Sequence, residues 1–373
     1  MTSDLEARQI NTIRGLALDA VKRANSGHTG TAMALAPLAH VLFTKVMKYD
    51  ASEPAWPDRD RFILSAGHAS MLLYSMLYLT GYGIELDDIK DFRQMGSRTP
   101  GHPEVGVTPG VEVTTGPLGQ GIANAVGMAL AERHLQKRLG SEVVDHRIWA
   151  VCGDGDLMEG LSHEAASLAG HQQLGNLVVI YDDNRITIDG ATELAVSDDA
   201  QRRFESYGWD VRNLGEASED SALLETSLVG AAQQNEKPTL LILRSHIGFP
   251  APTAVDTAGA HGAITDDAEI AAAKQAMGMD PESTFQVDDD VLNAYRQAGI
   301  RGVASRKEWL ARVADSDLDA TWIDTLLTGT PLANWTDELP SYEAGVSLAT
   351  RNANNQVVDA LIDVVPLFGV GFS

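Results

Sequence analysis

The sequence is poor in cysteine and in positive charge. It has one cysteine, Cys152, which excludes an intrachain disulfide and a cysteine-rich metal site. Only 28 Lys and Arg stand against 52 Asp and Glu, giving a formal net charge of −24. Such a surface repels nucleic acid and anionic membranes, so we expect neither as a partner. A phosphorylated ligand would need a local positive feature, such as a metal ion, helix N termini or a few His and Arg.

Long apolar runs are also missing. The longest lies around residues 71–79 and is too short to span a bilayer. Residues 1–8 include acidic side chains and no apolar run, unlike a signal peptide. The composition, 44% hydrophobic and 21% charged over 373 residues, is ordinary for a globular protein. We therefore expect a cytoplasmic protein.

Strand-like and helix-like segments alternate through the first two thirds of the chain. Short, mostly apolar segments predict strands at 61–64, 147–152, 177–181 and 239–243, and the segment 209–211 is also strand-like. Helical periodicity predicts helices at 5–24, 32–46, 69–79, 122–135 and about 200–206. The alternation predicts an α/β fold with a parallel sheet covered by helices on both faces. Ligands of such sheets bind at the carboxyl ends of the strands.

Two other regions are distinct. Residues 95–121 are rich in Gly, Pro and Thr, and a loop of that length in a compact domain is usually functional. Beyond Gly262 the chain is mostly helical and acidic. It ends with an amphipathic helix over 349–365 and an apolar, strand-like tail over 366–373.

A candidate metal site follows two of the predicted strands. Gly153-Asp154-Gly155 ends one strand, and Asn184 follows the next. The Asp154 carboxylate, the Asn184 amide oxygen and a nearby main-chain carbonyl could share Mg²⁺, with a diphosphate completing the shell. Gly155 would let the phosphate approach the next helix N terminus. Two ordinary strand-to-helix turns explain the same pattern equally well.

Four of the ten histidines lie in loops that contain Gly or Pro: His28, His68, His102 and His261. A lone loop histidine is usually solvated. Four in separate loops of one α/β domain favour convergence on an anionic or carbonyl-bearing ligand, because imidazole donates to phosphate or to a sugar oxygen.

Taken together, these segments resemble the transketolase family. The Gly-Asp-Gly to Asn arrangement is similar to the thiamine-diphosphate signature, and the flanking segments occur in the family's order over nearly the whole chain. They are residues 26–28, 65–68, 100–104, 114–121, 181–190 and 261–262.

The resemblance implies thiamine diphosphate and Mg²⁺ as cofactors, with Ca²⁺ or Mn²⁺ as substitutes. The implied metal ligands are Asp154, Asn184 and the main-chain carbonyl of Ile186. The implied cofactor contacts are His68, Gly116, Pro117, Leu118, Gly155, Asn184, Ile247 and His261. For Leu118 and Ile247, core packing explains the residue type equally well.

The implied reaction moves a two-carbon ketol (glycolaldehyde) unit from a ketose phosphate to an aldose phosphate, as in the pentose phosphate pathway. His28, His102, His261 and Arg351 would contact the sugar phosphate. His28 and His102 would also be catalytic, with Glu159 and Glu164 in a network across a dimer interface. From the residues alone, the two glutamates suit a helix N terminus, and Arg351 suits an exposed helix surface.

The tail departs from the family pattern. A second, pyrimidine-binding domain normally opens with a strand leading into Gly-Gly-Ser-Ala-Asp-Leu and carries the activating glutamate, whereas residues 367–373 read Leu-Phe-Gly-Val-Gly-Phe-Ser. We therefore expect a diphosphate-binding domain with a helical linker over 1–345 and the start of a truncated pyrimidine domain over 346–373, incomplete alone. The expected partner is a second copy in a homodimer or a separate chain carrying the pyrimidine domain.

Several alternatives stay open at this point. The chain could be one subunit of a split transketolase, a non-catalytic cofactor-binding fragment, or part of a dihydroxyacetone synthase, which shares these segments. A complete enzyme of a related thiamine-diphosphate family is less well supported, since no domain with an activating glutamate is visible. A magnesium-dependent nucleotide enzyme is least supported, because neither a P-loop nor a Gly-x-Gly-x-x-Gly fingerprint occurs.

Overall fold

The computed structural model describes residues 4–319, 321, 323, 325, 334–362 and 364–365. The chain divides into two units. The first comprises Met1–Ala55, Arg59–Leu130 and His146–Val303, and the second comprises Trp56–Asp58, Ala131–Asp145 and Ala304–Ser373. The domain division expected from the sequence, 1–345 and 346–373, stays a prediction.

The first unit is built around a five-stranded sheet in the order β1-β2-β3-β7-β6, in which every neighbouring pair is parallel. The strands are β1 (Arg61–Leu64), β2 (Ile148–Gly153), β3 (Leu177–Asp183), β6 (Asp210–Asn213) and β7 (Thr239–Arg244). All five strands were predicted, to within two residues at each end. The α/β fold class with a parallel sheet is therefore confirmed.

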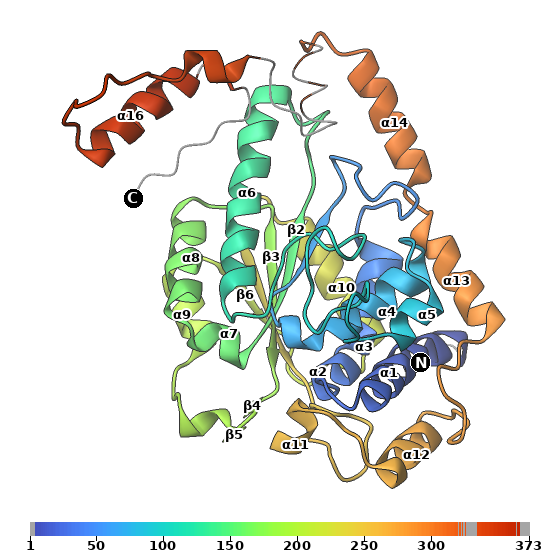
Figure 1. Cartoon of the computed structure of the whole chain (residues 1–373). Helices are drawn as coiled ribbons and strands as arrows, with labels where there is room; N and C mark the ends of the chain where they lie inside the picture. The colour runs from blue at the N-terminus through green and yellow to red at the C-terminus, as the bar shows by residue number, and fades with distance from the viewer. Residues whose placement is uncertain are drawn as a thin grey trace. The chain divides into compact units, whose positions relative to one another are not determined.

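Alternate strand residues face two apolar layers, so helices cover both faces of the sheet (Figure 1). Trp149 and Val151 point into the first layer, whereas Ala150 and Cys152 point into the second. Helices of the first layer are α1 (Asp4–Ala24), α3 (Ala36–Val41), α4 (Ser70–Thr80), α5 (Leu86–Lys90), α10 (Ser221–Ala232) and α13 (Asp289–Gly299). Helices of the second are the first half of α6 (Gln120–Leu139), α8 (Gly160–His171) and α9 (Ala200–Ser206).

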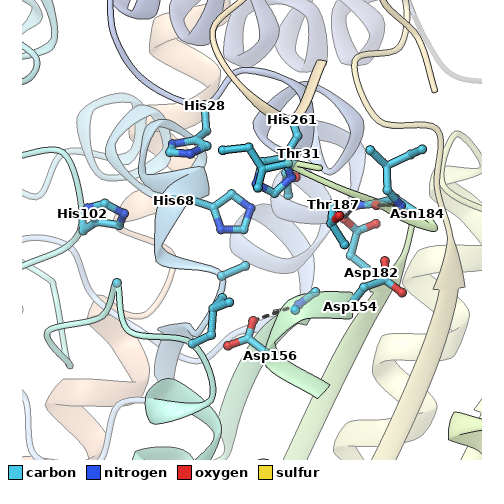
Figure 2. Close-up of a pocket in the computed structure, with 17 residues that line it drawn as sticks. His28, Thr31, His68, His102, Asp154, Asp156, Asp182, Asn184, Thr187 and His261 are labelled. Carbon is cyan, nitrogen blue, oxygen red and sulfur yellow. Dashed lines mark hydrogen bonds between the residues drawn. The ribbon is translucent and has the colours of Figure 1, made fainter. Parts of the chain in front are cut away.

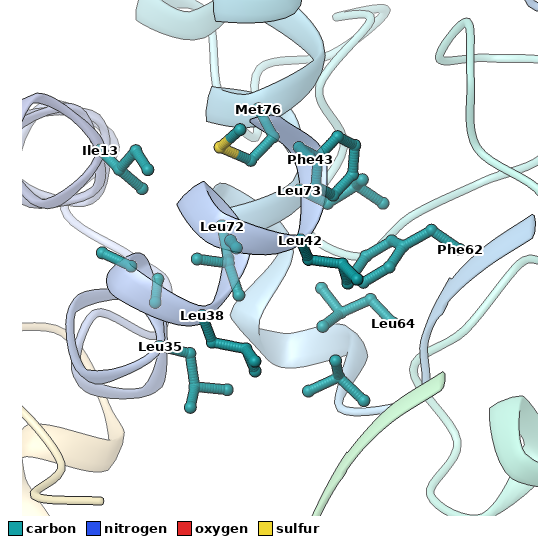
Figure 3. Close-up of a cluster of buried hydrophobic side chains, with 14 of the residues drawn as sticks. Ile13, Leu35, Leu38, Leu42, Phe43, Phe62, Leu64, Leu72, Leu73 and Met76 are labelled. Carbon is teal, nitrogen blue, oxygen red and sulfur yellow. The ribbon is translucent and has the colours of Figure 1, made fainter. Parts of the chain in front are cut away.

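The first layer is closely packed around α4 (Figure 3). Leu72, Leu73 and Met76 of this helix are buried there, and the rings of Phe43 and Phe62 meet edge to face at 5.1 Å. The dense apolar packing on both sides of β1 and β2 holds the strand ends in place, and the candidate site lies at those ends.

The remaining elements of this unit are short. A third apolar cluster joins α1 to α2 (Gly30–Ala34), α11 (Ala258–His261) and α12 (Asp267–Ala276). The others are η2 (Gly67–Ala69), α7 (Asp154–Met158), η3 (Thr192–Leu194) and the antiparallel pair β4 (Ile186–Thr187) and β5 (Gly190–Ala191).

One predicted helix differs from the structure. The helix expected over 32–46 is divided into α2, α3 and the π-helical turn η1 (Leu42–Val46). Pro37 lies in the first turn of α3, and its ring nitrogen has no hydrogen to donate to the preceding turn. The chain therefore starts a new helix at Ala36, because proline is tolerated only near a helix N terminus.

The second unit has its own small core of Trp56, Leu139, Val143, Trp309 and neighbouring side chains. The Trp309 Nε1 donates to the Val143 carbonyl at 2.7 Å. The other elements after the first unit are α14 (Val303–Ala314), η4 (Trp335–Glu338) and α16 (Thr350–Leu361). The predicted strand-like tail, 366–373, lies outside the described residues.

None of the helices in the described part of the chain combines the length and apolarity that crossing a bilayer requires.

Candidate functional site

The Gly-Asp-Gly turn and Asn184 lie side by side at the carboxyl ends of β2 and β3. Gly153 at the end of β2 is in register with Asp182 on β3, so Asp154 and Asn184 each leave the sheet at the same edge. Both side chains are buried, Asp154 at 8% exposure and Asn184 at 5%. The sheet therefore brings together the two side chains that the sequence predicts as metal ligands.

Two hydrogen bonds orient the Asp154 carboxylate. Its Oδ1 accepts from the Tyr181 hydroxyl at 2.6 Å, and its Oδ2 accepts from the Arg185 main-chain N–H at 3.1 Å. The Asn184 Oδ1 accepts from the Ile186 N–H at 2.9 Å, and its amide nitrogen donates to Asp182 at 2.8 Å. Each of these oxygens keeps a further lone pair for a cation.

Negative charge accumulates at this edge of the sheet. Burial raises the pKa of the Asp154 carboxyl to about 6, with Asp183 adding to the rise and the bonds from Tyr181 and Arg185 opposing it. Burial likewise raises the pKa of Asp182 to about 7, and Asp154 and Asp183 add to it. A divalent cation would relieve this repulsion, so the donor set fits a hard cation.

The donor set is one carboxylate, one amide and one main-chain carbonyl. Within the ranges that the structure describes, no group of three His, Cys, Asp or Glu side chains forms a metal site. The candidate magnesium site therefore depends on phosphate oxygens to complete its shell, which is how Mg²⁺ is often bound.

The structure brings the four loop histidines together. The His28 ring centroid lies 5.2 Å from that of His68, 5.4 Å from that of His261 and 6.3 Å from that of His102. The His68 and His261 centroids are 4.7 Å apart. These rings come from four segments that are distant in the sequence, with His68 in η2 and His261 at the end of α11, so their convergence is a property of the fold.

All four imidazoles are held in the neutral form. Burial lowers the pKa of His28 to about 4 and that of His68 well below its ordinary value, and the neighbouring rings add to the effect. Burial also lowers the pKa of His102 and of His261. A neutral imidazole has one donor and one acceptor nitrogen, so it can both give and take a proton.

Three buried polar atoms near the histidines find no hydrogen-bond partner among the described residues: His28 Nδ1, His261 Nδ1 and Thr115 Oγ1. Buried polar atoms are nearly always paired. The missing partners are what a bound polar ligand would provide.

A cavity of about 250 Å³ joins the histidines to the strand ends (Figure 2). Ten predicted site residues line it: His28, His68, His102, Gly116, Leu118, Asp154, Gly155, Asn184, Ile186 and His261. In Figure 2 the imidazoles lie on one side and the oxygens of Asp154, Asp182 and Asn184 on the other.

Two glycines of the cavity allow neighbouring side chains to pack closely against the main chain. Gly116 has a φ of 139°, and a Cβ there would lie 3.3 Å from the His102 ring. A Cβ on Gly155 would lie 3.0 Å from Leu118 Cδ1. Gly155 lies inside α7 and borders the Leu118 side chain. Because Gly155 has no side chain, there is room beside it for Leu118 and for a ligand.

Other predicted residues lie outside the cavity wall. Ile247 is fully buried in the third apolar cluster, which matches its alternative interpretation as core. Pro117 is exposed beside Gly116, and Glu159 and Glu164 are exposed at the start of α8 and within it. Arg351 is exposed on α16, in the second unit. The roles assigned to all these residues stay predictions.

Sequence reasoning missed Asp156, which organises the site. Its carboxylate accepts from the Ser65 hydroxyl at 2.7 Å, from the Gly119 N–H at 2.8 Å and from the Gly153 N–H at 3.0 Å. These bonds tie the end of β2 and two loops of the cavity to one buried group. The tight alternation Gly153-Asp154-Gly155-Asp156 was the only local signal for it.

Six further lining residues were also not predicted: Thr31, Ala66, Gly153, Asp182, Thr187 and Ile188. Thr31 comes from α2, and Thr187 and Ile188 come from the β4–β5 hairpin. Gly153 belongs to the Gly-Asp-Gly turn, and Ala66, Asp182, Thr187 and Ile188 lie in segments that carry the family resemblance. Thr31 belongs to none of these, and only the folded chain places it at the cavity.

Comparison with known proteins supplies the family. The profile described as "Transketolase, thiamine diphosphate binding domain" matches residues 5–326. A transketolase from Geobacillus stearothermophilus is 45% identical over 378 residues, covering 99% of this chain and 56% of that protein. A chloroplastic transketolase from Zea mays is 45% identical over 377 residues, covering 98% and 55%.

Solved structures agree with the sequence matches. The transketolase of Pichia stipitis in complex with sedoheptulose-7-phosphate has a TM-score of 0.92 at 42% identity, covering 98% of this chain and 55% of that chain. The transketolase of Campylobacter jejuni has a TM-score of 0.90 at 38% identity, covering 98% and 56%.

The chain spans about half the length of the curated relatives that it matches. Within that half, the thiamine-diphosphate profile covers most of the described residues, and the strand ends carry the Asp154 and Asn184 oxygens beside four clustered imidazoles. The chain belongs to the transketolase family.

Proposed function

We propose that this chain forms the magnesium- and diphosphate-binding part of a transketolase active site, which transfers a two-carbon ketol unit from a ketose phosphate to an aldose phosphate. The observation that carries the proposal is the single cavity that joins the oxygens at the ends of β2 and β3 to four neutral imidazoles. The relatives compared above are transketolases, which supports ketol transfer over the dihydroxyacetone synthase alternative.

The metal would be held by the Asp154 carboxylate, the Asn184 Oδ1 and the main-chain carbonyl of Ile186. Mg²⁺ is the proposed ion, with Ca²⁺ or Mn²⁺ as substitutes. The raised pKa of Asp154, about 6, supports this assignment. Burial disfavours the ionised carboxylate, and a neighbouring cation would stabilise it. The diphosphate would supply the remaining oxygens.

Thiamine diphosphate, when bound, supplies the electron sink for breaking and forming a carbon–carbon bond next to a carbonyl. The residues of this chain bind and orient the cofactor. His68 and His261 are proposed to donate to the cofactor near its diphosphate, and Leu118 to contact its rings. Leu118 is 37% exposed, so this apolar surface is free to meet a ring.

Proton handling is assigned to His28 and His102. Both rings are neutral near neutral pH, because burial lowers the pKa of each, so each can accept a proton at one nitrogen and donate from the other. The buried, unpartnered His28 Nδ1 supports a contact with a sugar hydroxyl or carbonyl oxygen. His261 and Arg351 are proposed to complete the sugar-phosphate contacts.

The proposed substrates are sugar phosphates of the pentose phosphate pathway. Solved Pichia stipitis transketolases hold sedoheptulose-7-phosphate, xylulose-5-phosphate and fructose-6-phosphate. Because the chain has a net charge of −24, the phosphate of such a sugar would have to be bound by local positive groups.

The proposed assembly is a homodimer, or this chain with a second chain that carries a pyrimidine-binding domain. The exposure of Glu159 and Glu164 on α8 supports a role at an interface. A cytoplasmic location is part of the same proposal.

Substitution of Asp154 tests the site. Asp154→Ala removes one proposed metal ligand, and we expect magnesium-dependent binding of thiamine diphosphate to fall below detection. The control Asp267→Ala removes an exposed carboxylate that pairs with Lys22 and does not line the cavity, and it should bind as the parent does. Equal binding by the parent and Asp154→Ala would contradict the metal assignment.

Ketol transfer is tested separately. The chain is assayed with xylulose-5-phosphate and an aldose phosphate acceptor, by itself and with a polypeptide that matches the remaining length of the Geobacillus relative. Turnover that exceeds the sum of the two parts supports the proposed reaction. Intact cofactor binding with no turnover in either assay would contradict the reaction and leave the cofactor site standing.

A further inference from the structure

The guanidinium of Arg93 lies between two loops of the candidate site. Its Nη1 donates to the Ser26 hydroxyl at 2.8 Å, two residues before His28. On the other side it covers Gly101, since a Cβ at Gly101 would be 2.9 Å from Arg93 Nε and 3.1 Å from its Cζ. Gly101 directly precedes His102, so one side chain contacts the neighbours of both predicted proton-transfer residues.

The backbone and one neighbouring ring hold Arg93 in this position. Its φ of 62° lies in the left-handed region, and its N–H donates to the Thr99 carbonyl at 3.0 Å. The guanidinium carbon lies 5.6 Å from the centre of the buried Phe92 ring. A non-glycine residue in this conformation is strained, which marks a position that the rest of the fold imposes.

The loop opposite Arg93 is also fixed. The Tyr74 hydroxyl lies 2.8 Å from the Pro100 carbonyl and 3.0 Å from that of His102, so it can donate to either one. Tyr74 belongs to α4, which is buried along its whole length. The distance between Arg93 and the His102 loop is therefore set by the core.

Arg93 differs from the nearby Arg98 in its charged partners. Among the residues that the structure describes, no Asp or Glu comes within ion-pair distance of Arg93, and its buried Nε has no acceptor. Arg98, five residues later, differs: it pairs with Asp88 at 3.4 Å and donates to the Gly83 carbonyl at 2.8 Å. A half-buried guanidinium that forms no ion pair with a described carboxylate does not stabilise the fold through its charge. In a chain of net charge −24, where carboxylates are abundant, this points to another role for Arg93.

The groups that face the two imidazoles are few. Around His28 they are the rings of His68, His261 and His102, together with Arg93. Around His102 they are the His28 ring and two groups of opposite charge, Arg93 and Glu104.

Among the residues that the structure describes, Arg93 is thus the one full positive charge that acts on both rings. It adds to the effect of burial, which lowers the pKa of His28 to about 4 and also lowers that of His102.

We propose that Arg93 is a positioning residue, whose guanidinium ties the Ser26–His28 loop to the Gly101–His102 loop and places a fixed positive charge beside both imidazoles. The charge disfavours a second positive charge on either ring, so both stay neutral. The effect on the rings does not depend on the proposed function. What the neutral rings then do in ketol transfer rests on that function.

The test is an NMR titration of the imidazoles in the cofactor-free chain, above the isoelectric point of about 4.6. Arg93→Met keeps a side chain of similar length and removes the charge. We expect the pKa of both His28 and His102 to rise toward the ordinary value. Arg93→Lys keeps the charge, and we expect both values to stay near those of the parent.

Arg98→Met is the matched control, because it removes an arginine of the same loop that does not contact either histidine loop. It should leave both pKa values unchanged. Unchanged values in Arg93→Met, or equal rises in Arg93→Met and Arg98→Met, would overturn the inference. Because no cofactor is present, loss of thiamine-diphosphate binding does not alter either outcome.

A second variant covers the case in which Arg93→Met does not fold. Ser26→Ala removes the acceptor of the guanidinium at an exposed position, where folding is not at risk. The freed guanidinium should move away from His28, so the pKa of His28 should rise while that of His40, a buried histidine elsewhere in the core, stays the same. No rise would overturn the inference.

Discussion

Tyr181 offers a sharp test of how the chain prepares its metal site. Its hydroxyl donates to Asp154 Oδ1 at 2.6 Å, while its ring is buried in the second apolar layer. Tyr181→Phe removes one oxygen and keeps the ring, so the core stays packed. Asp154 then keeps only the bond from the Arg185 N–H at 3.1 Å.

The size of the effect follows from the loss of one of two orienting bonds. Removing a group that orients a metal ligand costs about 10–100-fold in metal affinity, or about 1.4–2.8 kcal/mol. The lost bond also opposes the rise in the pKa of Asp154, which is about 6 with the bond in place. The carboxyl of the variant should hold its proton more tightly, so the loss of affinity should be larger at pH 6 than at pH 8.

The assay is calorimetric titration of Mg²⁺ into the chain in the presence of thiamine diphosphate. Tyr207→Phe is the control, because its hydroxyl lies 3.4 Å from His163 Nδ1 and does not contact Asp154. We expect weaker binding in Tyr181→Phe and parent-like binding in Tyr207→Phe. Equal dissociation constants for the two variants would refute the reasoning.

Three further predictions concern stability, each measured by urea denaturation. Lys274→Met leaves the buried Asp19 carboxylate without the ammonium that lies 2.6 Å away, and it should cost about 3–5 kcal/mol; a cost of less than about 1 kcal/mol would contradict a buried pair. Burial lowers the pKa of His40 to about 4, so the neutral ring contributes about 3 kcal/mol to the free energy of unfolding above pH 6.5, and this contribution is lost as the pH falls toward 4. His40→Gln should therefore make the free energy of unfolding depend less steeply on pH in this range. An unchanged pH dependence would contradict the assignment. Gly170→Ala should destabilise, because its Cβ would lie 1.9 Å from a main-chain oxygen, whereas Gly127→Ala, with open space around it, should stabilise by up to about 1 kcal/mol; the reverse order would contradict the packing.

The part of the fold that follows from local pattern could be predicted. Four of the five strands are short apolar runs of mostly buried residues, and their hydrophobicity marks them, whereas β6, at one edge of the sheet, is mostly polar and only partly buried. The four histidines could be singled out because they lie beside Gly or Pro, and the Gly-Asp-Gly turn could be singled out because it directly follows a predicted strand. The break at Pro37 could also have been read from the sequence, but the apolar periodicity on either side of it concealed the new helix start.

The part that depends on long-range contacts could not be predicted. Asp156 matters because Ser65 and Gly119 donate to it, and nothing in the sequence pairs those positions. Arg93 matters because it lies over Gly101 and reaches Ser26. Ile247 is buried in the third apolar cluster, and the cofactor contact that the family resemblance implies for it stays a prediction.

The central claim is that the ends of β2 and β3 bind a diphosphate through a metal ion. The most direct measurement is calorimetric titration of thiamine diphosphate into the purified chain with Mg²⁺ and, in parallel, with EDTA. We predict saturable binding with Mg²⁺ and none with EDTA. Equal binding in both, or no binding in either, would contradict the claim.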